Sequence, residues 1–187
     1  MICVYADGED ACLSKFYDGS DYRRVLGLYS GIFPLLVQND VIHLHASYII
    51  HDGKAILFTG PSGIGKTTHA ELWQAHQGAL IVNGDVALIR KVNGQYCAFG
   101  VPVCGSSPYC ENISAPISAV FLLEKADENS VCVINNFDAV GRILKEVYRP
   151  ELSEYRQNIL FRTLDDFMNT VPVFLLKCRP DKDELKQ

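Results

Sequence analysis

The sequence of 187 residues lacks the features of several protein classes. No apolar run approaches the roughly 18 residues that a membrane-spanning helix needs, and the first residues do not resemble a signal peptide. No run of basic residues exceeds two, and the formal net charge is −5. Repeats and low-complexity segments are also absent. We therefore expect a cytoplasmic globular protein with neither a nucleic-acid nor a membrane partner.

The cysteines follow no recognisable pattern either. There are seven of them, an odd number, and none form a C-x-x-C pair. This favours small buried side chains in a reducing compartment over a disulfide framework or a zinc site. Apolar residues make up 48% of the chain, which is ordinary for a compact domain. We expect one domain, with an edge strand and a helix from residues 1–40 packed on a core of residues 41–187.

The most informative stretch is a complete G-x-x-x-x-G-K-[ST] motif at residues 60–67. Its glycines let backbone N–H groups point at phosphate oxygens, and the helix that follows adds its positive N-terminus. Lys66 is expected to reach the β and γ phosphates, and Thr67 to bind Mg²⁺. The alternative is a glycine turn that starts an ordinary helix. The predicted nucleotide-binding residues are Gly60, Pro61, Ser62, Gly63, Ile64, Gly65, Lys66, Thr67 and Thr68.

A hairpin leads into this P-loop. Residues 41–50 are rich in β-branched side chains, and a D-G turn at Asp52-Gly53 returns the chain as a strand over residues 55–59. This predicts an α/β domain whose mixed sheet has antiparallel neighbours. Strands are also predicted at 79–82, 86–92, 95–99, 117–123, 131–134 and 171–176, with a short edge strand or hairpin within 1–20. Helices are predicted at 22–29, 68–76, 138–148, 152–168 and from 181, and a long loop at 100–116.

Two acidic residues and one histidine are candidates for the chemistry. Asp85 follows a buried strand soon after the P-loop helix, where a carboxylate can hold Mg²⁺ or accept a proton. Glu124, at the end of another predicted strand, is a second candidate for the metal. His45 lies on the hairpin strand with His43 two residues earlier, but no local ligand set completes a metal site. Each of these residues also has an ordinary structural interpretation.

The loop at residues 100–116 offers further candidates. Gly105, Ser106 and Ser107 follow Cys104 and could form an anion-binding turn for a phosphoryl group or an acceptor, or simply a turn. Arg142 and Arg149 flank a predicted helix. Either arginine could reach the γ-phosphate, although surface arginines are common.

The pattern as a whole resembles the catalytic domain of HPr kinase/phosphorylase, which shares its nucleotide-binding fold with phosphoenolpyruvate carboxykinase. The resemblance covers roughly residues 22–183 and is closest to short HPr-kinase-like bacterial proteins. It implies roles for His45 and Asp85 in catalysis. It is carried by Leu44 to Ser47, Phe58 to Thr68, Asn83-Gly84-Asp85, Gly100-Val101-Pro102, Gly105-Ser106-Ser107 and Lys177 to Asp181.

Two departures from that family matter. The family has a pair of aspartates where this chain has Asn83 and Gly84 before its single Asp85. The chain also lacks the family's separate N-terminal domain and its HPr-binding helices, so HPr is not the expected substrate.

The resulting hypothesis is an ATP- and Mg²⁺-dependent kinase that phosphorylates a hydroxyl, most plausibly a serine of a peptide or small protein. Asp85, His45 and Lys66 are the predicted catalytic residues, and Thr67 and Asp85 the metal ligands. Asn83 is grouped with the 105–107 turn as a substrate or phosphate loop. The alternatives are a non-catalytic ATP-binding module and a kinase of small hydroxyl compounds. Because HPr kinases are hexamers, the resemblance also implies self-association.

Overall fold

The computed structural model describes residues 3–6, 9–12, 32–149 and 152–179. Its strands are β1 (Cys3–Ala6), β2 (Glu9–Cys12), β3 (Ile42–His51), β4 (Lys54–Thr59), β5 (Leu80–Asn83), β6 (Val86–Val92), β7 (Gln95–Phe99), β8 (Ser114–Lys125), β9 (Ser130–Val133) and β10 (Val173–Cys178). Its helices are α2 (Lys66–Gln77), α3 (Asn136–Glu146) and α4 (Glu154–Thr170), and residues 32–38 are also helical. No helix in these described ranges is long and apolar enough to cross a membrane.

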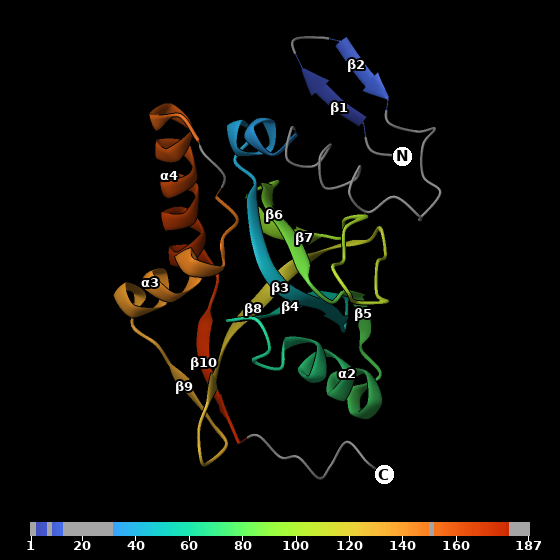
Figure 1. The fold of residues 1–187 in the computed structure, drawn as a ribbon, viewed down its shortest axis with the longest axis vertical. Coiled ribbons are helices and arrows are strands. Elements are labelled where there is room, and N and C mark those ends of the chain that lie inside the picture. The colour runs from blue at the N-terminus through green and yellow to red at the C-terminus, as the bar shows by residue number, and fades with distance from the viewer. Residues whose placement is uncertain (1–2, 7–8, 13–31, 150–151, 180–187) are drawn as a thin grey trace.

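Eight strands form one mixed sheet, in which the long strands β3 and β8 change partners along their length (Figure 1). The first half of β3 pairs antiparallel with β6, and its second half pairs with β4 on one edge and β5 on the other. β8 pairs first with β7, and then in parallel with β4 and β10. β9 lies outside β10. Since β6 and β7 also connect β3 to β8, these strands and β4 form a closed ring.

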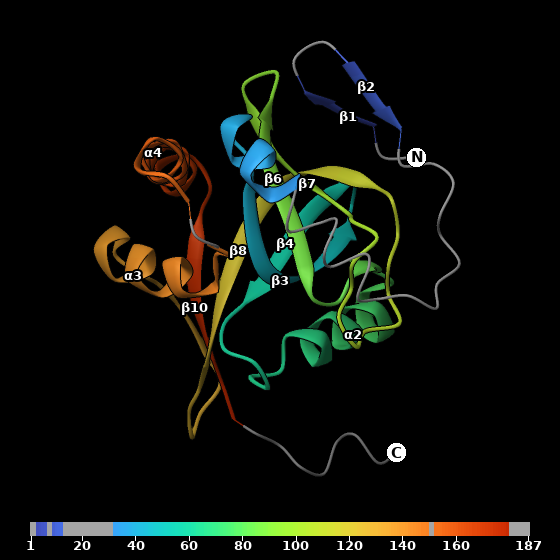
Figure 2. The same cartoon turned by 45° about the horizontal axis from the view of Figure 1, so that its top comes forward.

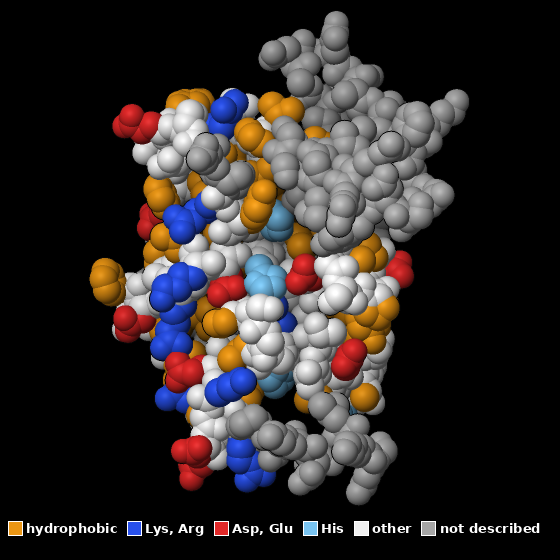
Figure 3. All heavy atoms as spheres, in the orientation of Figure 1, with side chains coloured by type: hydrophobic (Ala, Val, Ile, Leu, Met, Phe, Trp, Pro, Cys, Tyr) orange, Lys and Arg blue, Asp and Glu red, His pale blue; other side chains and the backbone are white. Residues whose placement is uncertain are grey.

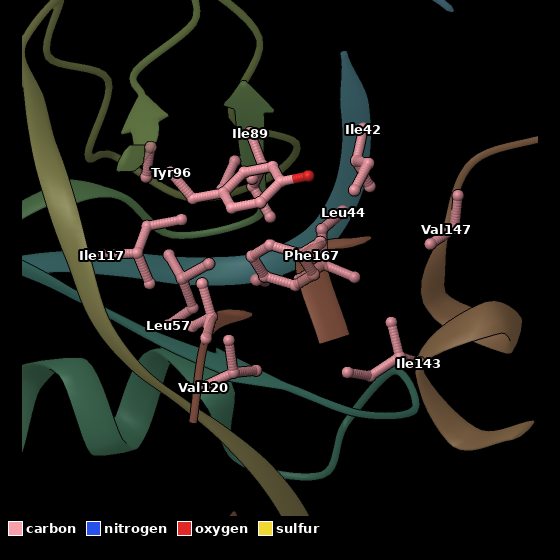
Figure 4. Close-up of a cluster of buried hydrophobic side chains, with 14 of the residues drawn as sticks. Ile42, Leu44, Leu57, Ile89, Tyr96, Ile117, Val120, Ile143, Val147 and Phe167 are labelled. Atoms are coloured by element: carbon pink, nitrogen blue, oxygen red, sulfur yellow. The ribbon is translucent and has the colours of Figure 1, made fainter. Parts of the chain in front are cut away.

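β4 separates two apolar cores, because successive side chains of a strand point to opposite faces. Leu57 joins the larger cluster, with Ile143 of α3 and Phe167 of α4 (Figure 4). Phe58 joins a smaller cluster with Ala70 of α2. Accordingly, α3 and α4 lie together on one side of the sheet and α2 lies apart from them (Figure 2).

Local signals fix the ends of the helices. The Asn135 side chain caps α3 by accepting a hydrogen bond of 2.9 Å from the backbone N–H of Asp138. Gly78 ends α2 in the left-handed conformation with φ of 66°, which glycine adopts without strain. α3 therefore begins and α2 ends where polar and glycine residues interrupt the helical pattern.

Most of the predicted elements are confirmed. The sheet is mixed, and a hairpin delivers the P-loop through a turn at Asp52 and Gly53, both with positive φ. A second turn of the same kind at Asn93 and Gly94 joins β6 to β7, whose bounds match the predicted ranges. Two-residue turns with positive φ match the twist of the strands that they join, which explains why both were readable from the sequence.

The predicted bounds of the long loop differ from the structure. β8 begins at Ser114, so the predicted loop ends earlier than residue 116 and Pro116 lies within the strand. Pro116 is the last residue of β8 that pairs with β7, and Ile117 is the first that pairs with β4, so the missing N–H falls where the strand changes partner. At the N-terminus, β1 and β2 pair antiparallel in a two-stranded sheet of their own, which is the hairpin alternative of the prediction for residues 1–20. The helices predicted at 22–29 and from 181 lie outside the described residues.

Replacing Phe167 tests the larger core. Its side chain is fully buried and packs edge-on against the Tyr96 ring, with 5.0 Å between the ring centroids. Phe167→Ala is therefore expected to lower the free energy of unfolding by about 3–5 kcal/mol. The control is Phe161→Ala in the same helix, where the side chain is 44% exposed and the loss is smaller. Denaturant unfolding measures both, and equal losses would contradict this description of the core.

Candidate active site

The P-loop connects β4 to α2 in a tight turn of exposed backbone. Gly60, Gly63 and Gly65 have φ values of 147°, 73° and 110°, a region that disfavours side chains. The backbone N–H of Ile64 donates to the carbonyl of Pro61 at 3.2 Å, which closes the turn. Pro61, Ser62 and Gly63 are exposed. The motif therefore has the backbone conformations and the access that a phosphate-binding loop requires.

Lys66 begins α2 and lies across the base of this loop. Its Nζ donates to the backbone carbonyls of Gly60 at 3.0 Å and Pro61 at 3.3 Å, and the residue is only 6% exposed. Burial lowers the pKa of Lys66, and the nearby carboxylates of Glu146 and Asp85 oppose that shift. The ammonium is thus held inside the loop by carbonyls alone, and incoming phosphate oxygens would be stronger acceptors.

The hydroxyl of Thr67 connects the P-loop to the turn that carries Asp85. Thr67 Oγ1 donates to the carbonyl of Gly84 at 3.2 Å, and Ser47 Oγ of β3 donates to the same carbonyl at 3.0 Å. The backbone N–H of Ala46 donates to the carbonyl of Asp85 at 3.0 Å. Two neighbouring segments thus hold the acidic turn against the start of α2.

His45 lies between two carboxylates at the open side of this turn. Its Nε2 is 3.2 Å from Asp85 Oδ1, and its Nδ1 is 3.0 Å from Glu146 Oε2 at the end of α3. Side-chain exposure is 32% for His45 and 37% for Asp85 but only 11% for Glu146. Figure 3 shows histidine atoms at the surface with acidic groups on either side. Solvent and solutes can therefore reach the histidine and one of its carboxylates.

His43 and His45 of β3 have opposite charge preferences. The hydrogen bond that His45 donates to Asp85 is the largest influence that raises the pKa of His45, and Glu146 adds to it while burial opposes it. His45 in turn is the main cause of the lowered pKa of Asp85. Burial beside Phe33 and Tyr148 instead lowers the pKa of His43 to about 4. The surroundings therefore favour the protonated ring at His45 and the neutral ring at His43.

Asn83 fastens the 100–113 loop to the acidic turn. The residue is fully buried, and its side-chain amide donates to the carbonyls of Val101 and Val103 at 3.1 and 3.0 Å. Its Oδ1 accepts from the backbone N–H groups of Asp85 and Val86, both at 2.9 Å. All of its hydrogen-bonding capacity is used inside the protein, so Asn83 positions the loop and does not face a ligand.

The 105–107 turn packs directly on the acidic turn. A Cβ at Gly105 would lie 2.5 Å from Asp85 Oδ2, and a Cβ at Gly84 would lie 2.0 Å from Ser107 Oγ. Ser107 Oγ also accepts from the backbone N–H of Tyr109 at 3.2 Å. Ser106 is exposed. The contact with Ser107 gives Gly84 a steric reason to stand where the resembled family has an acid.

Glu124 and Arg142 pair with each other. Arg142 Nη1 donates to Glu124 Oε2 at 2.5 Å, and Lys177 Nζ lies 3.8 Å from Glu124 Oε1. A Cβ at Gly60 would contact the carbonyl of Leu123, so this ion pair lies beside the start of the P-loop. Arg149 is exposed just beyond α3. The structure thus brings His45, Lys66, Thr67 and Asp85 together and commits Glu124 to two cations.

Sequence reasoning missed Glu146. It lies 101 residues from His45 in the chain, at the end of a helix with no motif around it. Within the described residues no group of three histidine, cysteine or acidic side chains is arranged to hold a metal ion by itself. The Thr67 hydroxyl and the Asp85 carboxylate, which flank the Gly84 carbonyl, provide the hard oxygen ligands that suit Mg²⁺ shared with phosphates.

The chain is similar to one protein family and to solved structures. The family model described as "ScmC: SynChlorMet cassette protein ScmC" matches residues 22–180. None of the curated proteins compared with the chain matches it. Among solved structures, the HPr(Ser) kinase/phosphatase from Coxiella burnetii is similar, at 15% sequence identity and a TM-score of 0.42, over 75% of this chain and 82% of that chain. A likeness this distant does not bear on activity, which has to be inferred from the site.

The ion pair of His45 and Asp85 makes stability depend on pH. A raised His45 pKa stabilises the fold below the ordinary value of 6.5, and this is lost as pH rises through the folded value. A lowered Asp85 pKa stabilises the fold above 3.8, and this is lost as pH falls through the folded value. The difference in unfolding free energy between wild type and His45→Gln is therefore expected to be largest between pH 3.8 and 6.5.

Denaturant unfolding across this pH range measures that difference. His76→Gln, at an exposed position of α2, is the matched control and is expected to give a difference that changes little with pH. A His45→Gln difference that is constant from acid to alkaline pH would contradict the ion pair.

Gly105→Ala tests the packing of the loop on Asp85. The new methyl group would contact the carboxylate at 2.5 Å and would also need φ of +57°, a left-handed conformation that costs about 1–2 kcal/mol for alanine. Gly94→Ala shares the positive φ but has no atom within 4 Å of its Cβ. We expect Gly105→Ala to lower the free energy of unfolding more than Gly94→Ala does. Equal losses would contradict the close packing of Gly105 on Asp85.

Proposed function

The chain belongs to the family of SynChlorMet cassette protein ScmC, and we propose that it is an ATP- and Mg²⁺-dependent kinase that transfers the γ-phosphoryl group to a hydroxyl. One observation carries the proposal. The hydrogen-bonded group of His45, Asp85 and Glu146 lies close enough to the P-loop lysine for both carboxylates to influence its pKa, and the side chains of His45 and Asp85 are open to solvent. A P-loop alone is common to many nucleotide-binding proteins, whereas transfer to an acceptor also needs a group that orients the acceptor.

Lys66 and the backbone N–H groups of residues 60–67 would bind the phosphates. Thr67 and Asp85 would hold Mg²⁺, which neutralises charge on the phosphate oxygens when bound. Lys66 already lies close enough to Asp85 and Glu146 for both carboxylates to influence its pKa. The γ-phosphate would therefore lie between the lysine and the acidic turn.

Asp85 would orient the acceptor hydroxyl and take its proton as the new oxygen–phosphorus bond forms and the bond to ADP breaks. His45 lowers the pKa of Asp85, so the carboxylate is a weak base. A weak base is sufficient when the transition state is loose, because positioning and charge stabilisation then supply most of the catalysis. When protonated, His45 would add positive charge next to the transferred group.

The acceptor is proposed to be a serine of a peptide or small protein. His45 and Asp85 are each about one-third exposed, so a side chain on a larger molecule can approach from solvent. The exposed Ser106 and the half-buried Ser107 lie on the rim of the same opening. Self-association is likewise proposed, on the family resemblance of the sequence.

Lys66→Ala tests phosphoryl transfer. The protein is incubated with γ-labelled ATP, Mg²⁺ and a panel of serine-containing peptides and free serine. Removing the ammonium is expected to lower the rate of transfer at least about 100-fold, because it stabilises developing charge on the phosphates. Lys91→Ala is the control and is expected to leave the rate unchanged, because the ammonium of Lys91 pairs with Asp166 at 2.7 Å on the surface.

Asp85→Asn separates transfer from binding. The amide cannot accept the acceptor proton, so we expect the rate to fall while ATP binding, followed by calorimetry, remains measurable. Transfer that survives Lys66→Ala unchanged would contradict the proposal. Tight ATP binding by the wild type with no transfer to any acceptor would instead assign the chain to non-catalytic nucleotide-binding modules.

A further inference from the structure

Glu146 is a partly buried acidic side chain to which the proposed reaction assigns no step. It is 11% exposed, and its carboxylate accepts from Nδ1 of His45 at 3.0 Å. Desolvating a carboxylate is costly unless it is hydrogen-bonded or paired. An exposed acid at the end of a helix would avoid that cost, so the arrangement points to a specific use of the contact.

The backbone that follows α3 places Glu146 over His45. Val147 forms a bridge with Leu44, the neighbour of His45 on β3, and the backbone N–H of Tyr148 donates to the carbonyl of His43 at 3.0 Å. Val147 is also buried, at 5% exposure. The segment after the helix is therefore attached to the same strand that carries the histidine, and the separation between Glu146 and His45 is set by backbone pairing.

A hydrogen bond at Nδ1 is needed to keep the imidazole of His45 in one orientation relative to Asp85. Its two nitrogens are separated by one ring carbon, and a half-turn about the Cβ–Cγ bond would put ring carbons where Nδ1 and Nε2 now meet the two carboxylates. With Nδ1 held by Glu146, only Nε2 is directed at Asp85. Gly105 packs beside Asp85, so the orientation of this carboxylate also depends on the contact of His45 with Oδ1.

We propose that Glu146 is a positioning residue, whose hydrogen bond to Nδ1 holds His45 in the orientation that aligns Asp85 with the acceptor hydroxyl. The proposal rests on the proposed kinase function and adds a residue to it. The hydrogen bond of Glu146 is made to His45 alone among the proposed catalytic residues, so the positioning effect is transmitted through the histidine. Carboxylates that orient a functional histidine in this way change activity by about 10–100-fold when they are removed.

Two substitutions separate orientation from charge. Glu146→Gln keeps a carbonyl oxygen that can accept from Nδ1–H, whereas Glu146→Leu has similar volume and no acceptor. Positioning predicts that Glu146→Gln retains kcat within about threefold and that Glu146→Leu loses about 10–100-fold in kcat with KM for Mg²⁺-ATP unchanged. The measured quantity is the rate at which γ-phosphate leaves Mg²⁺-ATP. Glu128→Gln, at an exposed position, is the matched control.

The second readout needs no turnover. Proton NMR of the full chain is expected to show an Nδ1–H resonance of His45 that persists in Glu146→Gln and disappears in Glu146→Leu. If the wild type transfers no phosphate to any acceptor, the kinase function fails, yet this resonance still decides whether Glu146 holds the ring. If Glu146→Leu does not fold, Glu146→Met, which also lacks a strong acceptor, replaces it.

Three results would overturn the proposal. Equal losses of kcat in Glu146→Gln and Glu146→Leu would show that the charge matters and the hydrogen bond does not. An Nδ1–H resonance that persists in Glu146→Leu would show that another group orients His45. A rise in KM for Mg²⁺-ATP with kcat unchanged would place Glu146 in nucleotide binding instead.

Discussion

The pairing of β3 on both of its edges determines where the site forms. At Ala46 the strand stops pairing with β6 and starts pairing with β4, whose last residue, Thr59, lies directly opposite. On the other edge of β3, the turn between β5 and β6 lies between the segments of β3 that pair with these two strands. The backbone carbonyl of Asp85 in this turn accepts a hydrogen bond from the N–H of Ala46. The phosphate loop leaves from one edge and the acidic turn from the other, so one strand sets the distance between them.

Hydrogen bonds between polar groups of the site stabilise this arrangement. The carbonyl of Gly84 accepts from both Thr67 and Ser47, and the buried amide of Asn83 ties the following loop to the same turn. A buried polar group that loses one partner costs about 1–3 kcal/mol, so these contacts resist rearrangement. Binding energy from a ligand then need not be spent on assembling the site.

Much of this was predictable from the sequence because it depends on local chemistry. The P-loop, the D-G and N-G hairpin turns and the placement of Asp85 after a buried strand all follow from residues close together in the chain. The mixed sheet followed from the hairpin that leads into the loop. The start of β8 was missed because Pro116, a residue that usually breaks strands, lies where β8 changes partner.

The contacts of the site that were not predicted are long-range. Glu146 reaches His45 because α3 returns across the sheet, and nothing near residue 146 marks it as part of a site. One turn earlier on the same helix, Arg142 forms an ion pair with Glu124, so the predicted γ-phosphate ligand and the predicted metal ligand bind each other. Asn83 was assigned to a substrate loop on the strength of its neighbours, and only its burial shows that it supports the loop.

The central claim is that the P-loop lysine and the acidic turn act on the same phosphate. A crystal structure with Mg²⁺ and a non-hydrolysable ATP analogue tests this most directly. The account predicts that Lys66 Nζ leaves the carbonyls of Gly60 and Pro61 for the β and γ phosphates, and that the γ-phosphate faces His45 and Asp85. An analogue bound elsewhere, or one whose γ-phosphate points away from Asp85 while Lys66 keeps its carbonyl partners, would contradict it.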